Sequence, residues 1–200
     1  MTDPGPALPL RVLLVDDGSP HLPLLRDELL RLGCEVLAVL DAAVELAASV
    51  TQLDPDLVII GADSPSRDTL EHIAVMSQAA PRPIVLFTDD PDRGRMQRAI
   101  RAGVSSYVVA GLAPERLRPI LDVALARFEA DAELRAELDA ARGQLQARKR
   151  IEKAKGILMQ ARGLSEEEAY REMRKMAMDR GVKLAQIAER IIDAKSMLSS

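Results

Sequence analysis

The stretch RVLLVDD, Arg11–Asp17, runs from an apolar segment directly into two adjacent carboxylates. Four more apolar runs follow it, at Glu35–Leu40, Asp56–Ile60, Pro83–Thr88 and Ser106–Val109. Amphipathic helical patterns separate them, at His21–Leu32, Ala42–Thr51, Asp68–Ala79 and Asp92–Ala102, and a further helix opens near Pro114. Apolar runs that alternate with helices predict an α/β fold, with a parallel five-stranded sheet covered by helices on both faces.

In an open parallel sheet, the functional crevice lies beyond the carboxyl ends of the strands. In this chain those ends carry Asp16 and Asp17, then Gly61, Thr88 and Ala110. The acidic pair has two interpretations. It is either a Mg²⁺ site, because hard cations prefer oxygen ligands, or a pair of solvated carboxylates at the end of a strand.

Composition excludes several classes of protein. The 200 residues are 48% hydrophobic, enough for a sizeable core, and Cys34 is the single cysteine. No internal disulfide or cysteine metal cluster is therefore expected, and Cys34 is predicted to be a buried structural thiol. His21 and His72 lack a second metal ligand at motif spacing, so we expect no metal and no cofactor. The absence of a signal peptide and of a long apolar run predicts a cytoplasmic protein without membrane contact.

Charge is distributed unequally along the chain. Residues 1–147 hold 14 arginines against 23 acidic residues, a balance of −9, whereas residues 148–200 hold 13 basic against 8 acidic residues, a balance of +5. All six lysines lie at or after Lys149. An acidic body with a basic end indicates that only the end meets a polyanion.

A long amphipathic helix is predicted from Pro114 to about Arg162, with Gly143 as its only strong breaker. One seam comprises Leu117, Leu121, Ala124 and Phe128, and after a phase slip a second comprises Leu134, Leu138, Ala141 and Leu145. Together the two seams favour a short two-stranded coiled coil and hence a homodimer. The alternative is a single helix folded back on the first domain. We expect domain boundaries at 1–113, 114–145 and 146–200.

The stretch ARKRIEKAKGILM, from Ala147 to Met159, is apolar on one side of a helix and basic on the other. Gly163 is a natural C-cap for it, and Ser165 with Glu168 fits a capping box for the next helix. Apolar residues from Leu184 to Ile192 mark a third helix. Three short helices fold by pooling their apolar stripes, so a small three-helix bundle is expected.

The first domain resembles the receiver domain of bacterial response regulators. The matching residues are VDD at Val15–Asp17, PDLVII at Pro55–Ile60, Thr88, and AGVSSY at Ala102–Tyr107. The resemblance implies a flavodoxin-like fold, an acidic pair for Mg²⁺, and a strand-end Asp that takes a phosphoryl group read by a Thr and a Lys. Here Gly61 replaces that Asp and Ala110 replaces that Lys. We therefore expect a degenerate site and a pseudo-receiver, because glycine offers no nucleophile and Asp63, two residues on, is displaced.

The C-terminal part resembles the ANTAR domain of the AmiR and NasT antitermination regulators, from about residue 134 onward. The motifs are RKRIEKAKGILM from Arg148, GLSEEEAY at Gly163–Tyr170, RKMAM at Arg174–Met178 and KLAQIA at Lys183–Ala188. ADSPSRDTLE at Ala62–Glu71 is most similar to NasT. The resemblance implies binding to hairpins of nascent leader mRNA and prevention of a terminator. It also implies control of nitrate and nitrite assimilation genes, a nitrate-sensing NasS-like partner, and action in the context of RNA polymerase.

Ten residues are candidate RNA contacts: Arg148, Arg150, Lys153, Lys155, Gly156, Arg162, Arg174, Lys175, Arg180 and Lys183. Gly156 either permits close approach of RNA or packs against a neighbouring helix. Tyr170 lies in an apolar stripe, which favours the core over stacking on a base. The rival functions are a DNA-binding response regulator and a protein-interaction adaptor that binds no nucleic acid. The sequence shows no nucleophile–base pair and no phosphate-cradling loop, so an enzyme is not expected.

Overall fold

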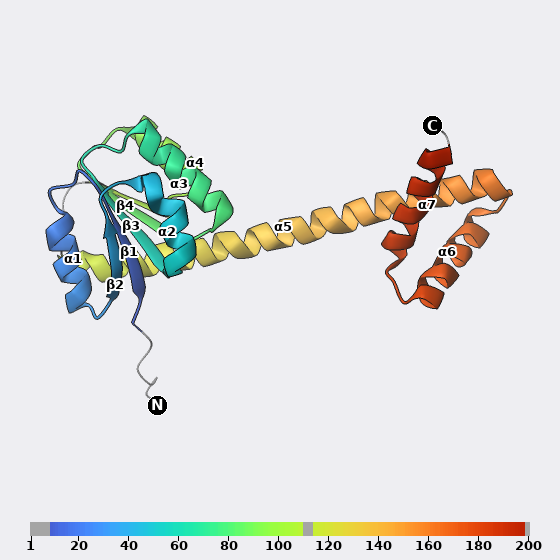
Figure 1. The fold of residues 1–200 in the computed structure, drawn as a ribbon, viewed down its shortest axis with the longest axis horizontal. Coiled ribbons are helices and arrows are strands. Elements are labelled where there is room, and N and C mark those ends of the chain that lie inside the picture. The colour runs from blue at the N-terminus through green and yellow to red at the C-terminus, as the bar shows by residue number, and fades with distance from the viewer. Residues whose placement is uncertain (1–8, 110–113, 199–200) are drawn as a thin grey trace, which may run out of the picture. The chain divides into compact units, whose positions relative to one another are not determined.

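The computed structural model of the chain describes residues 9–109 and 114–198. Its five strands are β1 (Arg11–Asp17), β2 (Glu35–Leu40), β3 (Leu57–Ala62), β4 (Ile84–Thr88) and β5 (Ser106–Val109). They form one parallel sheet in the order β2-β1-β3-β4-β5 (Figure 1). This confirms the predicted α/β class and its flavodoxin-like topology, in which the strand order reverses between β1 and β3.

The helices around the sheet are α1 (Leu22–Arg31), α2 (Leu46–Leu53), α3 (Arg67–Ala79), α4 (Arg93–Ala102) and α5 (Pro114–Arg162). The helices α1 and α5 cover one face, and α2, α3 and α4 cover the other (Figure 1). The helix predicted at Ala42–Thr51 is instead divided, because a short 3₁₀ turn, η1 (Ala43–Glu45), precedes α2.

Alternation along the strands builds two cores. Val12 and Leu14 of β1 face α1 and α5, whereas Leu13 and Val15 face α2, α3 and α4. Both faces are buried, so the strands are apolar throughout, and each buried Leu or Val contributes about 1.5–3 kcal/mol. Cys34 joins the first of these cores, as predicted, and burial raises the pKa of its thiol.

The caps of two helices fix the loops that follow β3 and β4. The Ser66 hydroxyl accepts a hydrogen bond from the Thr69 N–H (3.0 Å) at the start of α3. The Asp92 carboxylate accepts one from the Arg95 N–H (2.7 Å) at the start of α4. Because each cap satisfies an otherwise unpaired N–H group, both loops take defined paths at the carboxyl edge of the sheet.

The helix α5 is 49 residues long, as predicted from Pro114 to about Arg162, and it contains Pro119 as well as Gly143. A proline in this position removes one backbone hydrogen bond, the one to the carbonyl of Glu115. Glu115 and Pro119 are exposed, so water can satisfy that carbonyl, while the neighbouring Leu117 and Leu121 are buried against the sheet. No helix in the described residues is long and apolar enough to cross a membrane.

The chain divides into two compact units near Ala132. The core of the second unit joins the end of α5 with α6 (Glu166–Arg180) and α7 (Leu184–Leu198). It is built from small and flexible side chains: Ala154, Leu158, Ala169, Met173, Ala177, Ile187 and Ala188. The predicted capping box is present, with the Glu168 N–H donating to the Ser165 hydroxyl and the Ser165 N–H to the Glu168 carboxylate.

Candidate functional sites

The acidic pair at the end of β1 is engaged by its own neighbours. The Asp16 carboxylate accepts hydrogen bonds from the backbone N–H groups of Gly18 (3.1 Å) and Ser19 (3.2 Å). The Asp17 carboxylate accepts one from the hydroxyl of Thr69 on α3 (2.6 Å). Asp16 therefore shapes the turn after β1, and Asp17 ties that strand to α3. We had expected these carboxylates to be solvated, but both accept hydrogen bonds from protein groups and so stabilise the fold.

Gly61 of β3 pairs with Asp16 of β1, and the turn that follows β1 covers it. A Cβ at position 61 would lie 2.9 Å from the Cβ of Ser19 and 3.0 Å from the Cδ1 of Leu22. The Leu22 methyl is the end of a flexible side chain, but the Ser19 Cβ is attached to the backbone. A larger residue at 61 therefore requires Ser19, in the turn after β1, to shift.

The acidic pair has internal partners that the expectation of a residual Mg²⁺ site did not include. Mg²⁺ prefers a near-octahedral shell of oxygen ligands, to which a protein usually contributes one or two carboxylates. Asp16 and Asp17 already accept hydrogen bonds from protein donors, and Gly61 supplies no third carboxylate. Within residues 9–109 and 114–198, no cluster of three or more Asp, Glu, His or Cys side chains is arranged to hold a metal ion.

The hydroxyl of Thr88 is also occupied. It donates to the backbone carbonyl of Asp63 (2.7 Å) and accepts from the N–H of Asp90 (3.2 Å), and Thr88 is buried. The same Asp63 carbonyl accepts the Asp89 N–H (3.3 Å). Thr88 therefore joins the ends of β3 and β4 instead of facing an open crevice. Ala110, expected in place of the phosphate-reading Lys, lies outside the described residues.

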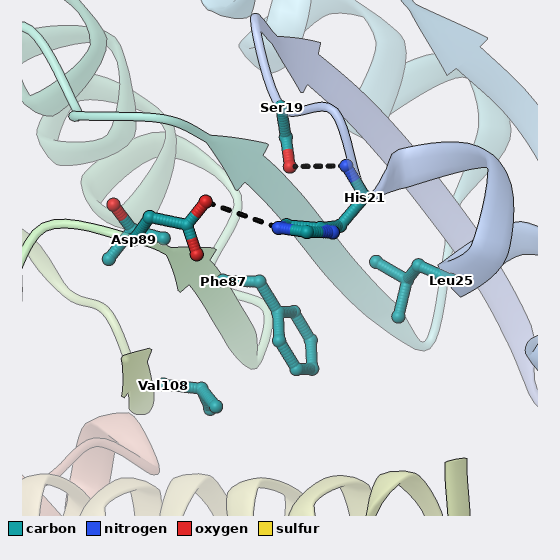
Figure 2. Close-up of a pocket in the computed structure, with 7 residues that line it drawn as sticks. Ser19, His21, Leu25, Phe87, Asp89 and Val108 are labelled. Carbon is teal, nitrogen blue, oxygen red and sulfur yellow. Dashed lines mark hydrogen bonds and ion pairs between the residues drawn. The ribbon is translucent and has the colours of Figure 1, made fainter. Parts of the chain in front are cut away.

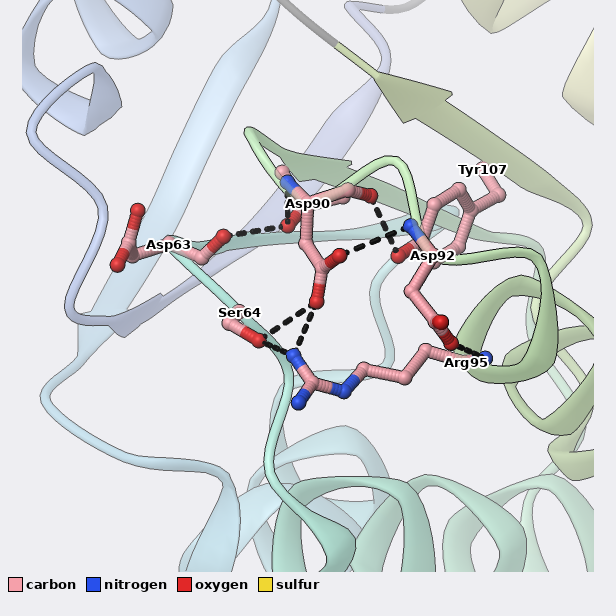
Figure 3. Close-up of polar contacts among 7 residues, drawn as sticks. Asp63, Ser64, Asp90, Asp92, Arg95 and Tyr107 are labelled. Carbon is pink, nitrogen blue, oxygen red and sulfur yellow. Dashed lines mark hydrogen bonds and ion pairs between the residues drawn. The ribbon is translucent and has the colours of Figure 1, made fainter.

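A second polar network, which we did not foresee from the sequence, adjoins Thr88 (Figure 3). The Asp90 carboxylate accepts hydrogen bonds from the Ser64 hydroxyl (2.7 Å), the Asp92 N–H (2.9 Å) and the Arg95 guanidinium. The bond from Ser64, followed by the bond from Asp92, lowers the pKa of Asp90. The Tyr107 hydroxyl donates to the Asp90 carbonyl (3.3 Å), and burial raises the pKa of Tyr107.

His21 has a partner from a distant part of the chain (Figure 2). Its Nε2 lies 3.2 Å from a carboxylate oxygen of Asp89, at the end of β4. Beside this pair is a small cleft of about 20 Å³, lined by Leu25, Phe87 and Val108. A space of this size holds a water molecule and no larger ligand. His21 and Asp89 therefore connect the start of α1 with the end of β4.

In the second unit, Lys155 is withdrawn from the basic surface. It is only 8% exposed, and its ammonium lies 2.8 Å from Glu152 and 2.6 Å from Glu166. The hydrogen bonds with Glu152 and then Glu166 raise the pKa of Lys155. Because Glu166 begins α6, this pair links that helix to α5. The geometry gives Lys155 the role of a positioning residue, in place of the predicted contact with phosphate.

Two more of the predicted contacts form ion pairs between helices. Arg150 lies 3.5 Å from Glu189 of α7, and Arg162 pairs with Glu172 of α6. All four side chains are partly open to solvent, where such pairs contribute only about 0–1 kcal/mol. These arginines can therefore exchange their carboxylate partners for phosphates at little cost, which Lys155 cannot.

The remaining basic candidates and Lys149 are exposed, and no ion pair involves them in the described part of the chain. They lie along the end of α5, along α6 and just before α7: Arg148, Lys149, Lys153, Arg174, Lys175, Arg180 and Lys183. Lys149 was not among the candidates that we selected from the sequence. This set, which we call the open basic set, can neutralise a polyanion without losing an internal ion pair.

The surroundings of Tyr170 and Gly156 decide between the alternatives that the sequence left open for them. Tyr170 is 44% exposed, so the expectation that it packs in the core is wrong; Ala169, one residue earlier on α6, is the buried neighbour. Gly156 lies within α5, and a Cβ built on it would meet no atom within 4 Å. Close packing against a neighbouring helix therefore does not account for this glycine.

Comparison with known proteins agrees with both halves of this description. The family model "Response regulator receiver domain" matches residues 12–122, and the model "ANTAR domain" matches residues 139–192. The chain is a response regulator. Its receiver domain includes the sheet and α1–α4, and its ANTAR domain includes the end of α5 with α6 and most of α7. Both assignments confirm the resemblances that the motifs indicated.

A relative that matches this response regulator over almost its whole length is a regulatory protein. The transcriptional regulatory protein PdtaR of Mycobacterium tuberculosis is 29% identical over 192 residues, which covers 96% of this chain and 94% of PdtaR. The nitrate regulatory protein of Klebsiella oxytoca is 38% identical over 65 residues, 32% of this chain and 16% of that protein. A solved signal receiver domain of a diguanylate cyclase from Desulfovibrio desulfuricans is 28% identical, with a TM-score of 0.54 over 62% of this chain and 99% of that one.

Proposed function

We propose that this response regulator is an RNA-binding antitermination factor that binds hairpins of nascent leader mRNA. The observation that carries the proposal is the open basic set, which lies on a three-helix ANTAR domain while the remainder of the chain is acidic. Its side chains are exposed and free of internal ion pairs, so phosphates can bind them without competition.

The proposed action on transcription follows from linkage. A protein that binds one hairpin, and not the alternative terminator, stabilises that hairpin by RT ln(1 + [protein]/Kd), about 2.7 kcal/mol at a hundred times Kd. The terminator, which competes for the same RNA strand, then forms less often while RNA polymerase passes. No chemical step is needed. The regulatory relative PdtaR covers almost the whole chain, which supports a regulator and not an enzyme.

We infer that the input is a partner protein and not phosphorylation of the receiver domain. The support is the crevice: Ser19 and Leu22 cover Gly61, the acidic pair is bonded internally, and Thr88 holds Asp63. The partial match to a nitrate regulatory protein supports nitrate and nitrite assimilation genes as targets, and a NasS-like sensor as the partner.

A homodimer is the proposed form of the protein, through the apolar seam on α5. Leu134, Leu138 and Leu145 are 65%, 48% and 55% exposed. Their four- and three-residue steps through Ala141 place them in one stripe, which a second copy of the helix would cover as a coiled coil. Two ANTAR domains would then be available to two hairpins.

The test of RNA binding is a titration with a two-hairpin leader RNA, a scrambled RNA and a duplex DNA, each at two salt concentrations. Preferential binding to the hairpins, weakened by salt, is expected. The variant Arg148→Glu/Lys153→Glu should lower the affinity at least tenfold and reduce the salt dependence by about one ion for each lost contact. Preference for DNA would favour the DNA-binding alternative, and no binding to any of the three would favour the adaptor.

The matched control is Arg135→Glu/Arg142→Glu, which changes the net charge by the same amount on the same helix. Both residues are exposed and precede the open basic set. If this control loses affinity as much as Arg148→Glu/Lys153→Glu does, net charge and not the open basic set governs binding.

Phosphorylation is tested directly by incubating the chain with acetyl phosphate and recording its intact mass. No added phosphoryl group is expected, because position 61 has no carboxylate. A stable acyl phosphate mapped to Asp63 would contradict the inferred route of input.

A further inference from the structure

The ANTAR domain contains an open groove, and most of the residues that line it lie outside the open basic set. The groove has a volume of about 440 Å³ and lies between α5 and α7. Ile157 and Ile192 give it apolar surface, and Gln160 contributes a side-chain amide. Lys153 and Lys195 also line it, so cationic, amide and apolar groups face the same space. Its volume falls within the roughly 300–1,000 Å³ that is usual for ligand clefts.

Gly156 belongs to the lining of this groove, and nothing else explains it. It lies within a regular helix, where glycine is unfavourable relative to alanine. Its φ is not positive, so its backbone conformation does not require glycine. No neighbouring atom would touch a Cβ, so packing does not require it either. What glycine does here is to leave helix backbone bare within the groove.

The chemistry of the lining selects one kind of occupant. A flat, apolar group can lie on the bare backbone at Gly156 and against Ile157 and Ile192. Gln160 presents both a hydrogen-bond donor and an acceptor at its side-chain amide, which is what the edge of a nucleobase requires. Its Oε1 already lies 3.4 Å from the Lys195 ammonium, so amide and cation act at the same place.

We propose that this groove receives one unpaired base from the loop of the bound hairpin. Proteins read RNA loops by holding splayed bases against flat or apolar surfaces and bonding to their edges. The base lies over Gly156, Gln160 bonds to its edge, and Lys153 and Lys195 contact the flanking phosphates. The assignment rests on the proposed function, and it adds a site for loop recognition to the contacts with phosphate.

The chain supplies its own matched control for this site. Gly143 lies in the same helix, α5, and a Cβ there would also meet nothing within 4 Å. It is exposed and is not part of the groove. Gly156→Leu and Gly143→Leu therefore make the same chemical change in the same kind of helix position, but only Gly156→Leu fills the groove.

The experiment measures the affinity of each full-length protein for a two-hairpin leader RNA and for the same RNA with abasic loop positions. Loss of one stacked base weakens single-strand binding roughly tenfold to a hundredfold. We expect Gly156→Leu to lose that factor on the intact RNA and nothing further on the abasic RNA. Gly143→Leu should match the unmodified protein on both, and circular dichroism should show that both variants keep their helices.

Three results would overturn the assignment. The first is a Gly156→Leu variant that binds intact hairpins as tightly as Gly143→Leu. The second is equal binding of intact and abasic RNA by the unmodified protein, which leaves RNA binding in place but removes the base site. The third is no hairpin binding by the unmodified protein, which refutes the proposed function and the base site with it. Gly156→Ala, which adds a single methyl group and favours the helix, repeats the test if Gly156→Leu lowers the helix content.

Discussion

Two glycines mark the contrast between the receiver domain and the ANTAR domain. At Gly61 a single added carbon would collide with Ser19 and Leu22, whereas at Gly156 it would meet nothing. At Gly61 the turn after β1 therefore packs directly on the strand. At Gly156 the space beside the helix stays open. The same residue type thus marks close packing in one domain and open space in the other.

The charged side chains repeat this contrast. In the receiver crevice the carboxylates of Asp16, Asp17 and Asp90 all accept hydrogen bonds from protein donors. In the ANTAR domain the basic residues divide into an internally bonded group, represented by Lys155, and the open basic set. Internal bonding therefore separates structural charges from those that can bind a ligand, and the sequence pattern alone does not.

The largest effect should come from reversing the charge that the ANTAR domain holds internally. Lys155→Glu places a third carboxylate beside Glu152 and Glu166, so α6 should lose its connection to α5. We expect the amide protection of α6 and α7 to be largely lost in hydrogen exchange, while the receiver domain keeps its protection. Lys149→Glu, on the exposed side of the same helix, is the control. Protected α6 amides in Lys155→Glu would show that Lys155 is not structural.

The second effect concerns the seam that the structure leaves uncovered. Leu134→Glu/Leu138→Glu would bury carboxylates in the proposed coiled coil, which should weaken dimerisation at least roughly a hundredfold. Sedimentation velocity over a concentration series measures the change. Ala132→Glu/Ala140→Glu makes a comparable charge change on the opposite side of α5 and should leave the dimer unaffected. A protein that is monomeric before any substitution would refute the proposed dimer.

The third effect concerns a substitution at Gly61. Gly61→Asp adds a carboxylate at the end of β3, but its Cβ requires Ser19, in the turn after β1, to shift. Overpacking of this kind should lower the free energy of unfolding by about 1–3 kcal/mol, as measured by urea denaturation. Gly143→Asp, which meets no neighbour, is the control for introducing the same side chain. Unchanged stability of Gly61→Asp would mean that the crevice opens readily.

The smallest effect is that of acid on the ANTAR domain. Hydrogen bonds with Lys155 lower the pKa of Glu166, and those with Ser165 lower the pKa of Glu168. A lowered pKa means that these carboxyl groups bind fewer protons in the folded state than in the unfolded state. The free energy of unfolding that they contribute is therefore present above the ordinary pKa of 4.5, and it is lost as the pH falls through their pKa values in the folded protein. Thermal melting at neutral pH and at about pH 3.5 should show the loss. Glu168→Gln keeps a capping side chain and should make the loss smaller.

Much of the fold could be predicted because its causes are local. The strands β2 and β5 have the bounds that their apolar runs indicated, and the Ser165–Glu168 capping box was evident from spacing. The predicted helix continues through Pro119 in the structure, because the burial of Leu117 and Leu121 compensates for the lost backbone hydrogen bond, which is a tertiary effect.

The candidate sites were harder to predict, because their decisive contacts join distant positions. Lys155 has one partner, Glu152, within the same helical turn, but its other partner lies beyond the turn at Gly163. The cover over Gly61 comes from the loop after another strand, and the Asp90 network joins two loops. Periodicity places such residues on a face of an element, but it does not say what packs against that face.

Tyr107, which donates a hydrogen bond to Asp90, can also serve as an intrinsic fluorescence probe of the receiver domain. The chain has no tryptophan and two tyrosines, one in each domain: partly buried Tyr107 and exposed Tyr170. In a Tyr107→Phe protein, all intrinsic fluorescence comes from Tyr170, and it should respond to RNA. In a Tyr170→Phe protein, the emission comes from Tyr107 and should respond to a partner that binds the receiver domain. Two single substitutions thus separate signal input from output without any added dye.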